Sequence, residues 1–147
     1  MVDITSKPDI VRIAKASGKI FLKKGTIEKI ERGEIKKGDV FEVSRVAATL
    51  AVKNTPQIIP LCHPINITNV KVDFIINEDS IEAIVEVKAK APTGVEMEAL
   101  HGVLTALLNI WDMVKYLEKD ERGNYPTTEI GSVKVISKVK IENEASG

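Results

Sequence analysis

The residues best suited to chemistry lie in "PLCHP", residues 60–64, which contain the one cysteine of the chain and one of its two histidines. A zinc site needs three or four Cys, His or carboxylate ligands, and Cys62, His63 and the distant His101 do not supply them at a recognisable spacing. A Cys62 nucleophile with His63 as its base is also unfavourable, because adjacent residues of an extended segment point in opposite directions. The segment predicts a small buried Cys62 and a stiff turn that presents His63. That histidine either caps a neighbouring group, which the local pattern favours, or is held in a fixed orientation for binding.

A second set of ionisable groups lies in "WDMVK", residues 111–115. Asp112 and Lys115 are three positions apart, so they are neighbours on a helix. An ion pair at this spacing is usually a solvated surface feature, but helical geometry places Lys115 in line with Leu104 and Leu108, at the edge of an apolar stripe. Partial burial favours the neutral amine while the aspartate favours the ammonium ion. A pair balanced in this way is suited to proton transfer.

The segment "TGVEMEAL", residues 93–100, adds two carboxylates at the expected start of the same helix. Thr93 and Glu96 have the spacing of a capping box, which predicts a structural role for Glu96. Glu98 falls in the first turn, where a carboxylate complements the helix dipole. Both carboxylates therefore have a structural explanation that does not require a functional site.

Residues 99–111 of this helix contain no Asp, Glu, Lys or Arg. The expected core stripe consists of Leu100, Leu104, Leu107, Trp111 and Val114. The opposite side carries only Gly102, Thr105, Ala106 and Asn109. Because neither side of this helix is charged, we expect both sides to be buried. The sheet would cover one side and a second subunit the other. Glu98 and Asp112 are also 14 residues apart, about 21 Å along a helix, so they either have separate roles or meet in a pocket between chains.

Periodicity along the chain predicts the elements that position these residues. Strands are expected at 11–23, with a possible bend at Gly18, in a hairpin over 69–91 and at 132–142. Helices are expected at 25–35, from Asp39 to a point before Pro56, and at 94–119, with a surface loop over 120–131. Asp39 and Glu42 have capping-box spacing. The order predicts a single α+β domain over 1–147, most simply a ferredoxin-like antiparallel sheet with helices packed on one face.

Composition limits the possible functions. The 147 residues include 21 Lys and Arg and 21 Asp and Glu, so the net charge is zero, and the aromatic residues are three Phe, two Tyr and one Trp. Neutral charge and few aromatics argue against an RNA-binding sandwich. The chain contains no apolar run of about 20 residues, and it begins without the apolar stretch of a signal peptide. We therefore expect a cytoplasmic protein, and the single cysteine, which cannot form an internal disulfide, agrees with that compartment.

Five motifs together resemble one family. They are "MVDIT" (1–5), "KKGDV" (36–40), "IPLCHP" (59–64), "TGVEMEAL" (93–100) and "WDMVK" (111–115). In this order and spacing they resemble the molybdenum cofactor biosynthesis protein C (MoaC) family over nearly the whole chain. The resemblance implies a ferredoxin-like α+β fold. It also implies a homohexamer, a trimer of dimers, with the active site between subunits.

The resemblance further implies a lyase, cyclic pyranopterin monophosphate synthase, of molybdenum cofactor (molybdopterin) biosynthesis. Such an enzyme converts a cyclised GTP derivative, (8S)-3′,8-cyclo-7,8-dihydroguanosine 5′-triphosphate, to the pterin product and diphosphate. The conversion involves no net redox change, so no resident cofactor such as a haem, a flavin or an iron–sulfur cluster is expected, and no residue is assigned as a metal ligand. It needs several proton transfers and cations for the triphosphate.

The resemblance assigns roles to individual residues. Asp112 becomes the acid/base group, with Lys115 beside it. The substrate-binding residues become Leu61, Cys62, His63, Glu96, Met97 and Glu98, with Lys37, Lys53, Arg12 and Lys138 at the family's basic positions. His101 receives no role beyond that of a helix residue. The tail "KVKIENEASG" replaces a glycine-containing tail of bacterial members, a difference that concerns the phosphate-binding groups.

One alternative function stays open at this point. A non-catalytic ferredoxin-like module could bind a small effector or assemble a complex. It would leave "LCHP" and "WDMVK" as ordinary surface features. Turnover of the cyclised GTP derivative distinguishes this module from an enzyme.

Overall fold

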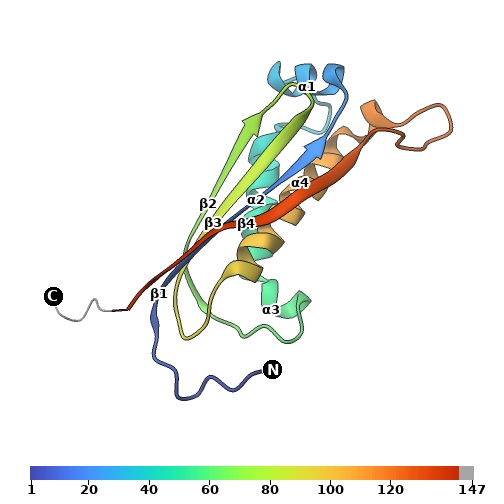
Figure 1. The fold of residues 1–147 in the computed structure, drawn as a ribbon. Coiled ribbons are helices and arrows are strands. Elements are labelled where there is room, and N and C mark those ends of the chain that lie inside the picture. Colours follow the sequence, from blue (N-terminus) through green and yellow to red (C-terminus); the bar gives the residue numbers. More distant parts are fainter. Residues whose placement is uncertain (143–147) are drawn as a thin grey trace.

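The computed structural model describes residues 1–142, and Figure 1 shows the path of the chain. Its elements are, in order, β1 (Ile10–Phe21), α1 (Lys24–Glu31), α2 (Val40–Lys53), α3 (Thr55–Ile58), β2 (Asn66–Ile76), β3 (Ser80–Ala91), α4 (Glu96–Glu118) and β4 (Glu129–Ile141). The sequence did not predict the short helix α3, and β4 begins inside the segment that was expected to be a loop. Within residues 1–142, no helix is both long and apolar enough to cross a membrane.

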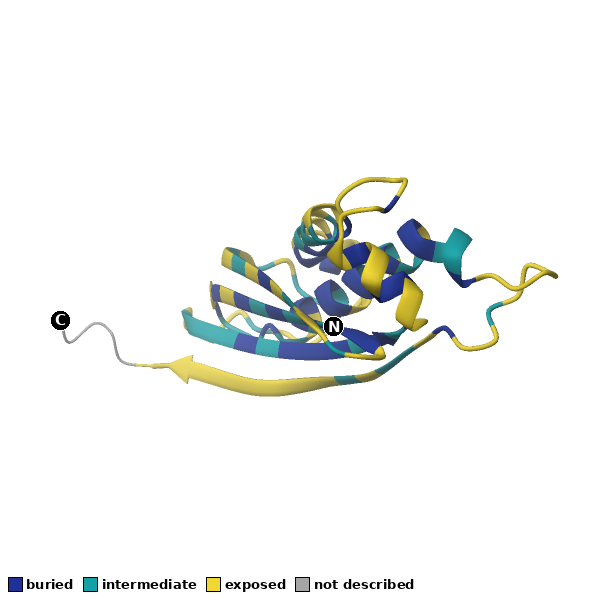
Figure 2. Cartoon of the chain, turned by 90° about the horizontal axis from the view of Figure 1, so that it is seen from above, coloured by how far each residue is buried: buried dark blue, intermediate teal, exposed yellow. Residues whose placement is uncertain are grey.

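The four strands form one antiparallel sheet in the order β2-β3-β1-β4. The helices lie on one side of this sheet, and residues 1–142 leave the other side uncovered (Figure 2). Strand order and connections are those of a ferredoxin-like α+β fold, so the predicted fold class is confirmed. Alternate residues of β3 are buried under the helices: Ile81, Ala83, Val85, Val87, Ala89 and Ala91.

The face of α4 that packs on the sheet differs from the predicted one. Leu107 and Val114 are buried as expected, but Leu104 is 45% exposed. Gly102 and Ala106, which the pattern placed on the outer side, lie in the core instead. The reason is close packing: a Cβ on Gly102 would lie 2.9 Å from Val52 Cγ2 of α2 and 3.1 Å from Val85 Cγ1 of β3. Small residues let α4 approach both elements, and Leu104 and Leu108 are left exposed.

The two capping predictions have opposite outcomes. At the start of α2, the carboxylate of Asp39 accepts a hydrogen bond from the Glu42 backbone N–H at 3.1 Å, as predicted. At the start of α4 the predicted capping box is wrong. The helix begins at Glu96, its N-cap is Val95, and no side chain caps it. The Glu96 carboxylate is directed to another partner, described below.

Gly18 lies where β1, β4 and α4 pack closely together. A Cβ there would lie 2.8 Å from Val103 Cγ1 of α4 and 2.9 Å from Val133 Cγ2 of β4. The pairing of β1 with β4 is irregular on both sides of this point, between Lys15 and Ala16 and between Ser17 and Lys19. The bend expected near Gly18 is therefore an irregularity of the β1–β4 pair.

A buried carboxylate fixes the far end of α4. Glu118 is fully buried and accepts hydrogen bonds from the Lys23 backbone N–H at 3.1 Å and from the hydroxyl of Thr128 at 2.6 Å. The Thr26 hydroxyl also donates to it. These contacts join the end of α4 to the start of α1 and to the residue before β4. The turn of α4 that carries Asp112 and Lys115 is thereby held in place.

Candidate functional site

A cavity of about 290 Å³ lies at the start of α4 and brings together six of the residues singled out by sequence. The loop after α3 contributes Leu61, Cys62 and His63, and the first turn of α4 contributes Glu96, Met97 and Glu98. The lining is completed by Thr93 and Gly94 and by three residues of the N-terminal segment, Val2, Ile4 and Lys7. The N-terminus, α3 and the start of α4 lie at the same end of the molecule in Figure 1.

Two ionisable groups of this cavity, Glu98 and Cys62, are biased toward their protonated forms. Glu98 is only 3% exposed, and burial raises the pKa of its carboxyl group, with a further contribution from the nearby charge of Glu96. Burial also raises the pKa of the Cys62 thiol, followed by the charges of Glu98 and Glu96. Cys62 is thus a neutral thiol and a poor nucleophile or metal ligand. Glu98 is a carboxyl group that can hold a proton closer to neutral pH than an ordinary glutamate.

A second cavity, of about 260 Å³, adjoins the first and contains two of the expected basic residues. It is lined by Arg12 of β1 and Lys138 of β4, and it shares Gly94 and Glu96 with the first cavity. Lys138 Nζ lies 3.2 Å from Glu96 Oε1, while the other Glu96 oxygen, Oε2, is buried without a hydrogen-bond partner among residues 1–142.

Main-chain contacts fix the position of Arg12. Its Nε donates to the Ala91 carbonyl at 3.2 Å, and its Nη2 donates to the Pro92 carbonyl at 3.1 Å. These two bonds hold the guanidinium at the end of β3, just before α4 begins. A planar guanidinium offers five N–H donors, so three remain for other partners.

Lys53 lies at the same end of the helical layer, although it lines neither cavity. Helices α2 and α4 run antiparallel, since Asn109 Nδ2 donates to Ser44 Oγ near the start of α2 and the Thr55 hydroxyl meets His101 Nδ1 beyond its end, both at 3.0 Å. Lys53 is the last residue of α2, is exposed, and forms no ion pair within the described chain. It therefore lies toward the start of α4.

The remaining predicted residues form a separate cluster near the end of α4. Asp112 Oδ1 lies 3.0 Å from Lys115 Nζ, and Oδ2 lies 3.2 Å from Lys37 Nζ. Hydrogen bonds and charge from Lys115 and Lys37 lower the pKa of the exposed Asp112 carboxyl group. The loop that carries Lys37 is held against α4, because the Lys36 backbone N–H donates to the Tyr116 hydroxyl at 3.0 Å. The two ammonium groups therefore favour the ionised form of this carboxylate.

One chain therefore carries two separate groups of predicted residues at opposite ends of α4, which we call half-sites. Glu98 and Asp112 belong to the same uninterrupted helix, so about 21 Å of helix separates them. No single small molecule reaches both on one copy. Between the half-sites, the outer side of the helical layer exposes five apolar side chains, Val43, Val46 and Leu50 of α2 and Leu104 and Leu108 of α4.

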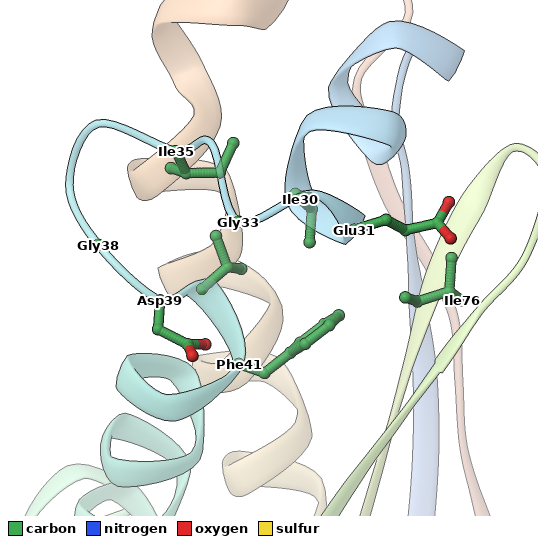
Figure 3. A pocket seen from close by; sticks show the side chains of 9 residues that line it. Ile30, Glu31, Gly33, Ile35, Gly38, Asp39, Phe41 and Ile76 are labelled. Atoms are coloured by element: carbon green, nitrogen blue, oxygen red, sulfur yellow. The ribbon is translucent and has the colours of Figure 1, made fainter.

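A larger cavity, of about 540 Å³, lies elsewhere and contains none of the predicted residues. Figure 3 shows it between the end of α1, the start of α2 and Ile76 at the end of β2. Its ionisable lining residues are Glu31 and Asp39, both acidic. Asp39 already caps α2. Two carboxylates and an apolar lining do not suit a polyphosphate.

Sequence reasoning missed several lining residues and one polar contact. Val2, Ile4 and Lys7 received no role, although "MVDIT" was one of the motifs that carried the resemblance. His101 contacts Thr55, whose hydroxyl also donates to the Ala51 carbonyl at 2.9 Å. Because that hydroxyl has one proton, His101 Nδ1 must be the donor in their contact. His101 thus links α3 to α4 through its Nδ1–H group.

Comparison with known proteins shows which family this chain belongs to. Residues 1–140 match the model of the MoaC family. A protein of Methanosarcina mazei is 56% identical over 140 residues, which cover 95% of this chain and 89% of that protein, and it is named probable cyclic pyranopterin monophosphate synthase. Proteins of Archaeoglobus fulgidus (56% identical, 95% of this chain and 90% of that protein) and Thermococcus onnurineus (54%, 97% and 91%) have the same name. On this evidence the chain belongs to the MoaC family.

Proposed function

We propose that this protein is a cyclic pyranopterin monophosphate synthase. It converts (8S)-3′,8-cyclo-7,8-dihydroguanosine 5′-triphosphate to cyclic pyranopterin monophosphate and diphosphate in molybdenum cofactor biosynthesis. The observation that carries the proposal is the cavity at the start of α4, where "LCH" and "EME" meet. Relatives with the synthase name over nearly their full length support it.

The two half-sites have different roles in the proposed reaction. Asp112 exchanges protons with the substrate, and Lys115 and Lys37 keep its carboxylate ionised. Glu98, whose pKa burial raises, is the complementary proton carrier, and His63 binds the substrate beside it. The remaining contacts come from Leu61, Cys62, Glu96 and Met97 in the cavity and from Arg12, Lys53 and Lys138 at the triphosphate.

Opposite half-sites become one active site when two copies pair. We propose that α4 of one copy lies antiparallel to α4 of another, so that Asp112 of one copy faces Glu98 of the other. The exposed apolar residues between the half-sites, including Leu104 and Leu108, then lie at the centre of the contact. Three such dimers form the proposed homohexamer. The cytoplasmic location stays a prediction from the sequence.

A turnover assay tests the proposal. Purified protein is mixed with the cyclised triphosphate, and diphosphate release and pterin formation are both measured. Asp112→Asn and Lys115→Ala should each lower kcat by about 10²-fold or more, with circular dichroism spectra like that of the parent. An inactive parent would favour a non-catalytic module, and full activity in both variants would remove the catalytic assignment.

A further inference from the structure

We propose that Lys140 is a further anion-binding residue, which extends the phosphate-binding surface of the site along β4. The inference rests on the proposed function, because it concerns the phosphate end of the same substrate.

Strand register places Lys140 beside the two expected phosphate ligands. Lys140 pairs directly with Arg12 across the β1–β4 ladder, and Lys138 pairs with Ala14 two residues further along. Since strand residues two apart share a face, Lys138, Lys140 and Arg12 all lie on the helix side of the sheet. Lys140 lines the 260 Å³ cavity together with Arg12 and Lys138.

A neighbouring cavity continues the same cationic surface. It has a volume of about 490 Å³ and shares Arg12, Gly94 and Lys140 with the 260 Å³ cavity. Lys7, which also lines the cavity that contains His63, contributes another ammonium group to it. Lys140 is thus common to two connected cavities, and both share lining residues with the His63 cavity.

The charges of the combined lining favour an anion. Four cationic residues, Lys7, Arg12, Lys138 and Lys140, face two carboxylates, Glu96 and Glu142. Lys140 Nζ lies 3.2 Å from Glu142 Oε1, and both side chains are more than half exposed. A pair this exposed contributes little stability, so a multiply charged phosphate can displace Glu142 from Lys140.

Binding of inorganic diphosphate, a product of the proposed reaction, tests this role by calorimetry. Lys140→Met should weaken diphosphate binding about three- to tenfold, and Lys140→Arg should retain most of the affinity. The matched control is Lys134→Met, an exposed lysine of the same strand that lines neither cavity, and it should change the affinity less than twofold.

Three results would overturn the inference. They are no measurable diphosphate binding by the parent, unchanged affinity in Lys140→Met, and equal weakening in Lys134→Met. The inference and the proposed function fail separately. If the protein binds diphosphate through Lys140 but does not turn over the substrate, the role of Lys140 is supported and the proposed function is wrong. If Lys140→Met has normal turnover with unchanged KM and unchanged diphosphate affinity, the proposed function is supported and the role of Lys140 is wrong.

Discussion

Lys37 and Asp112 lie 75 positions apart in the chain, yet the Lys37 ammonium contacts both the Asp112 carboxylate, at 3.2 Å, and the Asp112 backbone carbonyl, at 3.0 Å. Together with Lys115, Lys37 encloses the carboxylate between two cations. This arrangement makes Asp112 a more acidic group than an isolated aspartate, because each cation favours the ionised form.

Replacing Lys37 should raise the pKa of Asp112. In Lys37→Met the carboxylate loses one of its two ammonium partners, so it should bind a proton at higher pH than in the parent. Titration of the side-chain carboxyl carbon by NMR measures the change directly. Lys71→Met, which removes a lysine paired with Asp73 on β2, should leave the Asp112 titration unchanged. An unchanged Asp112 pKa in Lys37→Met would contradict the role given to this contact.

Glu98→Gln should reduce turnover without loss of stability at neutral pH. The folded protein holds a proton on Glu98 at pH values where the unfolded chain has released it, since burial raises the folded-state pKa. The parent's free energy of unfolding therefore falls as pH rises through this interval. The amide has no proton to lose, so the variant should gain stability relative to the parent as pH rises above about 4, the ordinary pKa of a glutamate.

Urea denaturation at several pH values measures the stability difference, and kcat measures the catalytic role. We expect kcat to fall about 10²-fold or more if Glu98 transfers a proton. A stability difference that is constant with pH would show that Glu98 titrates as an ordinary exposed glutamate.

Gly102→Ala and Gly25→Ala form a matched pair that tests the packing of α4. Alanine favours a helix over glycine by about 1 kcal/mol in both cases. At Gly102 the new methyl group would meet Val52 and Val85, whereas at Gly25 of α1 nothing lies within 4 Å. Overpacking costs about 1–3 kcal/mol, so Gly102→Ala should lower the free energy of unfolding and Gly25→Ala should raise it. Thermal denaturation of both variants measures these changes. Equal stabilisation of the two variants would contradict the close approach of α4 to α2 and β3.

Local patterns predicted the elements better than they predicted the packed faces. Capping of α2 by Asp39 needs residues only three positions apart, and it was predicted correctly. The buried side of α4 was mistaken because hydrophobicity favours Leu104 for the core. The core is instead occupied by Gly102, which permits a close approach of α4 to α2 and β3.

The site could be predicted only where the motif itself carries the information. "LCH" and "EME" were identified through the family resemblance, and their meeting in one cavity depends on how α3 and α4 pack. The contact between Lys138 and Glu96 joins strand β4 to the start of α4, and the two residues are 42 positions apart. No spacing rule connects such residues, which is why Glu96 was assigned to a helix cap.

Mixing two inactive variants tests whether one active site is built from two copies. Asp112→Asn and Glu98→Gln each damage one half-site, and about 21 Å of helix separates these half-sites within a chain. In a mixed dimer, one of the two shared sites contains both substitutions and the other contains neither. Random mixing should therefore restore about a quarter of the parent activity, given a twofold dimer with two equivalent sites.

Coexpression of the two variants with different affinity tags allows the mixed assemblies to be purified and assayed. The control is a mixture of the parent with a double variant that carries Asp112→Asn and Glu98→Gln in one chain. This mixture contains the same substitutions, but it contains no two inactive chains that could complement each other. Mixed single variants that stay as inactive as either alone would mean that Asp112 and Glu98 of different copies do not share a site. The pairing of α4 helices would then be wrong, whatever the size of the assembly.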